Sequence, residues 1–106
     1  TELMLSKSSM TGSICDAIIT PEPGKITFPI LKRLAGAGIV VTDEEALRAM
    51  ALAFKRLKII VEPGGAVALA AALFHGKALE SDTVIAITSG GNVDTDGFAT
   101  ALERFG

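Results

Sequence analysis

Short apolar runs alternate along the chain with longer segments in which apolar residues recur at helical spacing. The short runs predict three strands, at Ile39–Val41, Ile59–Val61 and Thr83–Thr88. The segments of helical spacing predict helices that begin at Thr27 and after the polar residues 42–45, and further helices over Ala66–Phe74 and Asp94–Phe105. Strands that alternate with helices are typical of a parallel sheet covered by helices. The sequence therefore predicts an α/β fold, a three-layer fragment built on a parallel sheet.

The clearest local signal is the helix start at Thr42-Asp43-Glu44-Glu45. This pattern is a capping box, in which the Thr42 side chain accepts a hydrogen bond from the Glu45 backbone and the Glu45 carboxylate reaches back to the cap. Leu47, Met50 and Phe54 follow at helical spacing. We interpret this apolar stripe as core packing, in preference to a cofactor contact.

The expected helix at Ala66–Phe74 has no polar face, and such a helix is buried on all sides. Hydrophobic residues make up 49% of the 106 residues, and the mean hydropathy is +0.48. A domain of this size buries only about 60–68% of the surface of its unfolded chain. Large apolar patches would then stay in water, and such patches mark interfaces. The composition favours a segment of a larger core or an obligate oligomer.

Charge and cysteine content exclude several classes of function. The net charge is −2, and the ten Lys and Arg are scattered, so the basic stripe of a nucleic-acid-binding protein is absent. The start of the chain does not resemble a signal peptide. The longest apolar run, Ala66–Phe74, is far shorter than the roughly 18 residues of a membrane span, so no membrane partner is expected. A single Cys15 excludes an internal disulfide, fits a reducing compartment and predicts a cytoplasmic protein.

Two glycine-rich turns, Glu62-Pro63-Gly64-Gly65 and Ser89-Gly90-Gly91-Asn92, each follow an expected strand. Ligands of open parallel sheets bind beyond the carboxyl ends of the strands. Glycine lets the backbone approach a ligand, and the helix that follows offers unpaired N–H groups. These turns are the candidate ligand site. The alternative is that the glycines only meet the steric needs of strand-to-helix turns, with Glu62 and Ser89 as helix caps.

Other residues that could carry chemistry have ordinary structural explanations. Cys15 and His75 lie in separate segments, so we interpret Cys15 as a small buried residue and His75 as a helix-terminal residue that complements the helix dipole. Asp94 and Asp96 could pair on a metal ion, but acids are common at a helix start. No cluster has metal-ligand spacing. The sequence predicts neither a metal site nor a catalytic residue within this chain.

Four ordered blocks between Ser13 and about Phe98 resemble the C-terminal part of the fold-type II pyridoxal-phosphate enzymes. They resemble the branch of threonine/serine dehydratases and serine racemases, and they span about four-fifths of the chain. The blocks are Ile14–Ala17, Pro23–Pro29, Val61–Ala66 and Ser89–Asp94. The resemblance implies that residues 1–106 are the C-terminal part of the α/β domain that binds pyridoxal phosphate, with residues 1–12 irregular.

The resemblance also implies a role for three residues. Ser89 would hydrogen-bond the pyridine nitrogen of the cofactor, Glu62 would form part of the pocket wall near the ring, and Ala17 takes a position, often glycine, where the backbone passes close to the cofactor. A hydroxyl can donate to a neutral ring nitrogen but cannot hold it protonated as a carboxylate would. That suits α-proton loss with departure of a β-hydroxyl, and it disfavours transamination.

The same resemblance implies that the chain cannot complete the reaction. The Schiff-base lysine and the substrate and phosphate loops of the family lie in its N-terminal region, and no segment here resembles them. We therefore expect the missing N-terminal portion of the same enzyme as a partner, in a homo-oligomer. The complete enzyme would eliminate water from L-threonine, L-serine or a related β-hydroxy amino acid to give a 2-oxo acid and ammonia. Serine racemisation, dehydration of 3-hydroxyaspartate and a free-standing binding or regulatory module stay open as alternatives.

Overall fold

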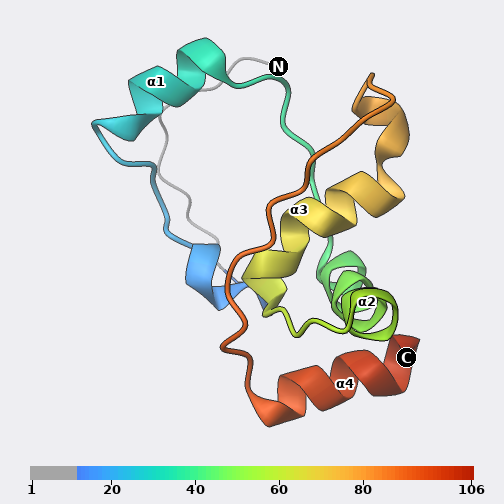
Figure 1. Cartoon of the computed structure of the whole chain (residues 1–106). Helices are drawn as coiled ribbons and strands as arrows, with labels where there is room; N and C mark the ends of the chain where they lie inside the picture. Colours follow the sequence, from blue (N-terminus) through green and yellow to red (C-terminus); the bar gives the residue numbers. More distant parts are fainter. Residues whose placement is uncertain (1–11) are drawn as a thin grey trace.

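The computed structural model describes residues 12–106, and within that range the regular elements are helical (Figure 1). The long helices are α1 (Thr27–Leu34), α2 (Asp43–Leu52), α3 (Pro63–Phe74) and α4 (Thr95–Phe105). Shorter helical segments are η1 (Asp16–Ile18), the π-helical turn η2 (Ala53–Leu57) that continues α2, and η3 (Gly76–Ala78). The expectation of an irregular segment at residues 1–12 lies, apart from Gly12, outside the described residues.

The predicted α/β fold is wrong, because residues 12–106 form helices and contain no strand. The three expected strands, Ile39–Val41, Ile59–Val61 and Thr83–Thr88, are irregular. Runs of Val, Ile and Thr fit a sheet, but a strand exists only where a neighbour completes its hydrogen-bond ladder. Near these segments we find a backbone bond from Glu62 to Gly90, and it is not extended into a ladder.

The expected helix starts are confirmed where side chains cap them. The backbone N–H of Thr42 donates to Glu45 Oε2 over 2.9 Å, and the Glu45 N–H donates to Thr42 Oγ1 over 3.2 Å, which completes the capping box. Asp94 caps α4 by accepting from the Gly97 N–H over 2.8 Å. α3 begins three residues before the predicted Ala66, because a proline at the first helical position is compatible with a helix start.

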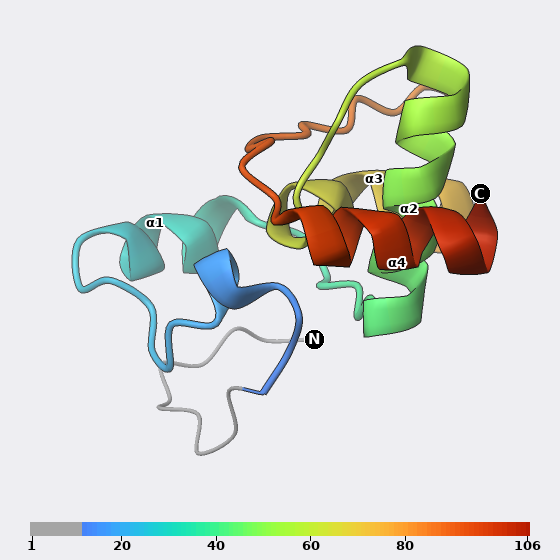
Figure 2. The same cartoon turned by 90° about the horizontal axis from the view of Figure 1, so that it is seen from below.

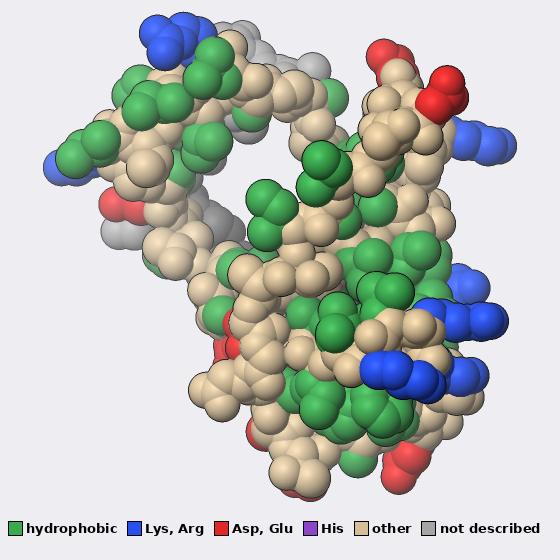
Figure 3. Space-filling view, viewed as in Figure 1, with side chains coloured by type: hydrophobic (Ala, Val, Ile, Leu, Met, Phe, Trp, Pro, Cys, Tyr) green, Lys and Arg blue, Asp and Glu red, His purple; other side chains and the backbone are tan. Residues whose placement is uncertain are grey.

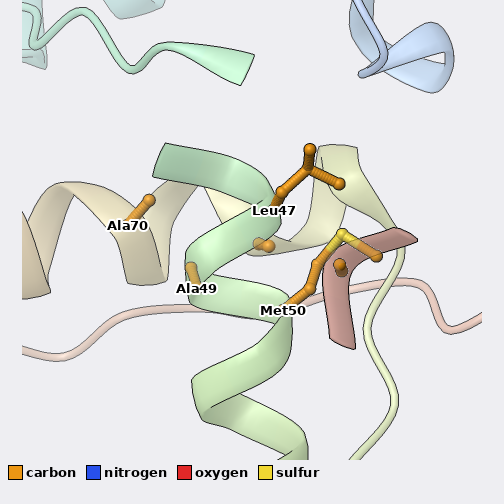
Figure 4. Close-up of a cluster of buried hydrophobic side chains, with 6 residues drawn as sticks. Leu47, Ala49, Met50 and Ala70 are labelled. Atoms are coloured by element: carbon orange, nitrogen blue, oxygen red, sulfur yellow. The ribbon is translucent and has the colours of Figure 1, made fainter. Parts of the chain in front are cut away.

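The core lies where α2 packs against α3 and α4 (Figure 4). Leu47 and Met50 project from α2, and Met50 is fully buried. The other buried members of the cluster are small: Ala49, Ala66, Ala70 and Ala101. Alanines at these positions let the helix backbones approach closely, so Met50 supplies much of the side-chain volume in the core.

Much apolar surface stays in contact with solvent. α1 packs against none of the other described helices and lies apart from them in Figure 2. The accessible surface is 7740 Å², against roughly 5600 Å² expected for a monomer of this mass. Val40 and Ile85 are 84% and 90% exposed. The expectation of exposed apolar surface is confirmed, whereas burial of α3 on all sides is wrong, since Leu73 is 49% exposed.

Candidate functional site

The two glycine-rich turns meet at the N-terminal end of α3. Glu62 is the residue before α3, and its backbone N–H donates to the carbonyl oxygen of Gly90 over 2.9 Å. A Cβ atom at Gly65 would overlap the carbonyl oxygen of Ser89. Glycine at position 65 therefore lets the Ser89 turn lie directly against the first turn of α3.

Gly90 makes the tightest approach between the turns. Its φ of +83° lies in the region that side-chain-bearing residues rarely adopt, and a Cβ there would collide with the carboxylate of Glu62. A Cβ at Gly91 would lie 2.9 Å from the carbonyl oxygen of Ile60. Both glycines thus serve packing between the turns, the steric explanation that the sequence left open.

The third predicted residue, Ala17, reaches the same helix end from η1. A Cβ at Gly64 would lie 3.7 Å from the Ala17 methyl carbon, so η1 contacts the first turn of α3. The structure therefore brings Ala17, Glu62 and Ser89 together from three separate segments. Ala17 and Ser89 are exposed and Glu62 is half-buried. Their roles toward a cofactor stay predictions.

A cavity of about 460 Å³ opens beside this helix end. Glu62 lines it, together with Asp16 from η1 and Asn92 and Thr100 on the α4 side, but neither Ser89 nor Ala17 does. Sequence reasoning did not assign Asp16, Asn92 or Thr100 to a site. A signal existed for the first two, because they lie within the Ile14–Ala17 and Ser89–Asp94 blocks.

The cavity wall is acidic, with carboxylates from Asp16, Glu62 and Asp94. Asp94 is held by its capping bond, so the ordinary interpretation of an acid at a helix start is confirmed for it. The positive ends of α3 and α4 also face this region and favour negative charge there. Among residues 12–106, no group of His, Cys, Asp and Glu has the arrangement of a metal site.

Cys15 and His75 serve separate structural purposes. Cys15 is 7% exposed, and burial raises the pKa of its thiol, which disfavours the reactive thiolate. The ring Nε2 of His75 lies 2.9 Å from Glu45 Oε1, which joins the C-terminal end of α3 to the capping box of α2. The interpretation of Cys15 as a small buried residue is confirmed.

The residues at the start of α3 fit one side of a pyridoxal-phosphate site. No side chain caps α3, so its first N–H groups remain available as donors. The Ser89 hydroxyl can donate to a ring nitrogen, and the packed glycines leave the backbone bare of side chains beside it. No lysine lines the cavity in the described part of the chain. The donor set thus fits the cofactor ring but holds no Schiff-base lysine.

Comparison with known proteins places this chain among such enzymes. Residues 4–90 match the family model of the pyridoxal-phosphate dependent enzymes. The chain is 35% identical over 95 residues to an L-threonine ammonia-lyase of Geobacter sulfurreducens, covering 90% of this chain and 24% of that protein. It is 36% identical over 103 residues to a catabolic L-threonine dehydratase of Staphylococcus aureus, covering 94% of this chain and 30% of the relative.

Solved structures agree with the sequence comparison. A bacterial-type threonine deaminase, that of T.th., superposes with a TM-score of 0.77 at 38% identity, covering 84% of this chain and 32% of the other. Maize serine racemase superposes with a TM-score of 0.80 at 33% identity, covering 94% and 33%. The chain belongs to the pyridoxal-phosphate dependent enzyme family, in its fold-type II branch of threonine dehydratases and serine racemases, as the four blocks predicted. It spans about a quarter to a third of the length of these relatives.

Proposed function

We propose that these residues form one side of the pyridoxal-phosphate site of a dehydratase that acts on L-threonine, L-serine or a related β-hydroxy amino acid. The observation that carries the proposal is the meeting of Ala17, Glu62 and Ser89 at the start of α3, in a chain of this family. With threonine, the β-hydroxyl leaves as water, a water molecule releases the nitrogen as ammonia, and 2-oxobutanoate remains.

The roles of the three residues follow from their chemistry. Bound pyridoxal phosphate supplies an electron sink for loss of the α-proton. The Ser89 hydroxyl donates to the neutral ring nitrogen, which keeps that sink weak and favours prompt departure of the β-hydroxyl over transamination. Glu62, fixed through its backbone bond to Gly90, forms the wall beside the ring. The Ala17 methyl group narrows the space on the η1 side.

The proposal requires a second region of polypeptide that carries the Schiff-base lysine. The relatives are three to four times longer than the part that this chain matches, which leaves ample length for such a region. We propose that this region is the N-terminal portion of the same enzyme, and that the complete enzyme is a cytoplasmic homo-oligomer. No helix within residues 12–106 is long and apolar enough to cross a membrane.

A second candidate activity is serine racemisation, which the similarity to maize serine racemase favours. Both reactions begin with loss of the α-proton, and they differ in whether the β-hydroxyl then leaves or a proton returns to the opposite face. Dehydration of 3-hydroxyaspartate would use the same steps on another side chain.

The experiment that tests the proposal begins with the reading frame upstream of Thr1. If it encodes a lysine in a family-like context, the protein that contains both regions is purified and supplied with threonine and serine. We expect release of 2-oxobutanoate and pyruvate. Formation of D-serine without a 2-oxo acid would establish the racemase instead. No pyridoxal-phosphate absorbance and no turnover would favour a binding or regulatory module.

A further inference from the structure

An apolar groove of about 300 Å³ runs between η2 and α3 and shares no lining residue with the cavity at the candidate site. Its walls are Leu52, Ala53, Arg56 and Leu57 on one side and Leu69 and Leu73 on the other. Leu57 is 59% exposed and Leu73 is 49% exposed, so the groove is open to solvent. On this part of the molecule, Figure 3 shows hydrophobic side chains gathered beside Lys and Arg.

The groove owes its shape to the π-helical turn. A π-helix bonds residues five apart, so Leu52 and Leu57 fall on the same side of the α2–η2 rod. Leu69 and Leu73 are four apart on α3 and share a face there. Lys58, with φ of 60°, then ends the helix. Two leucine pairs on adjacent helices thus face a common groove.

One edge of this groove is basic. Arg56 lines it, and the exposed Lys55 and Lys58 lie in the same stretch of chain. Lys58 Nζ donates to the carbonyl oxygen of Lys55 over 2.9 Å, so its cationic end stays close to η2. Residues 53–61 contain no acid. A partner that carries carboxylates beside its apolar side chains would therefore complement this edge.

We propose that the groove binds an amphipathic helix that carries Asp or Glu beside its apolar stripe, and that this helix belongs to the portion of the enzyme outside these 106 residues. The identity of that portion rests on the proposed function. A helix suits the groove because it satisfies its own backbone hydrogen bonds, whereas an extended peptide would need backbone partners that these side-chain walls do not provide. A second copy of the chain is disfavoured, because two basic edges would face each other.

The test uses a synthetic peptide of about 18 residues, long enough to form a helix in isolation. Leucines recur at helical spacing and glutamates flank them. One matched peptide has lysines in place of the glutamates, and another has the leucines scrambled. Binding to the 106-residue chain is measured by fluorescence anisotropy. We expect the glutamate peptide to bind about fivefold more tightly than the lysine peptide, the effect of about 1 kcal/mol from exposed charge pairs.

Two variants make the result specific to the groove. Arg56→Glu reverses the charge at an exposed position and should shift the preference toward the lysine peptide. Leu57→Ser should weaken the binding of both peptides, whereas Ile85→Ser, an exposed apolar position outside the groove, should not. Circular dichroism of each variant shows whether the helices are intact.

Several outcomes would overturn the proposal. Equal binding of the glutamate, lysine and scrambled peptides would show non-specific adhesion. Self-association that Leu57→Ser abolishes and Ile85→Ser leaves intact would show that a second copy occupies the groove. Binding to phosphatidylserine vesicles that displaces the glutamate peptide would assign the groove to a membrane surface. None of these measurements uses pyridoxal phosphate, so a failure of the docking proposal and a failure of the proposed enzyme are separate results.

Discussion

The backbone N–H of Glu62 donates to the carbonyl oxygen of Gly90 over 2.9 Å, and the side chain of Glu62 occupies the space that a Cβ at Gly90 would need. Through this pair the turn before α3 and the turn before α4 hold each other in place, and with them the residues of the candidate site.

The first prediction concerns that pair. Gly90→Ala places a side chain at a φ of +83° and against the Glu62 carboxylate, so the free energy of unfolding should fall by about 1–3 kcal/mol. The measurement is urea denaturation followed by circular dichroism. Gly36→Ala is the matched control, because nothing lies near its Cβ position. Equal stability of the two variants would show that Gly90 can adopt another conformation at no cost.

A second prediction concerns the core. Met50 is fully buried among alanines, so Met50→Ala leaves a cavity that small neighbours cannot fill, and we expect a loss of about 2–5 kcal/mol. Ile85→Ala removes an apolar side chain that is 90% exposed and should change the stability by less than about 0.5 kcal/mol. Comparable losses in the two variants would contradict the location of the core.

A third prediction concerns acid. The backbone N–H of Thr42, and then the His75 side chain, stabilise the Glu45 carboxylate and hold its pKa below the usual value. A carboxyl whose pKa is lowered by folding stabilises the protein above its unfolded pKa of about 4.3, and this contribution is lost as the pH falls through the lower folded value.

Glu45→Gln should therefore flatten the loss of stability on acidification below about pH 4.3, measured as the urea midpoint at each pH. Glu103→Gln, at an exposed position on α4, serves as the control. An acid limb that Glu45→Gln leaves unchanged would mean that the capping box and the His75 contact do not favour the ionised carboxylate.

Local features of this chain could be predicted from its sequence, and non-local ones could not. The helix starts at Thr42 and Asp94 were predictable, because a cap and its hydrogen-bond donor lie three residues apart. The strands were not, because the Val and Ile of 39–41 show only a preference, while the ladder depends on neighbours far away in sequence. The rule that ligands bind beyond strand ends nevertheless directed attention to two turns that do meet, since the glycines there have steric consequences whether or not strands precede them.

The candidate site shows the same division. Ser89, Glu62 and Ala17 were singled out from the four blocks, and the structure places all three at one helix end. The cavity at that end was not predicted, because Asp16 and Thr100 come together only through the packing of η1, α3 and α4. No pattern along the chain encodes that packing directly.

A fourth prediction is that the 106-residue chain alone has no dehydratase activity. The chain provides no Schiff-base lysine at the described site, so threonine and pyridoxal phosphate should yield no 2-oxobutanoate above a control without protein. The assay couples 2-oxobutanoate to a dehydrogenase and follows NADH. Turnover that tracks the purified chain would overturn the division of the active site between two regions.

The most direct test of the account is the effect of Ser89→Ala on the complete enzyme. Removing the hydroxyl leaves the ring nitrogen unpaired, and a buried hydrogen bond lost in this way costs roughly 1–3 kcal/mol, or about one to two orders of magnitude in an equilibrium constant. Pyridoxal-phosphate affinity, measured by titration of the apoenzyme, should fall by that factor together with turnover, while Ser81→Ala, in the exposed loop after α3, should change neither. If Ser89→Ala retains the parental affinity and turnover, Ser89 belongs only to a turn that packs against α3, and the proposed cofactor site is wrong.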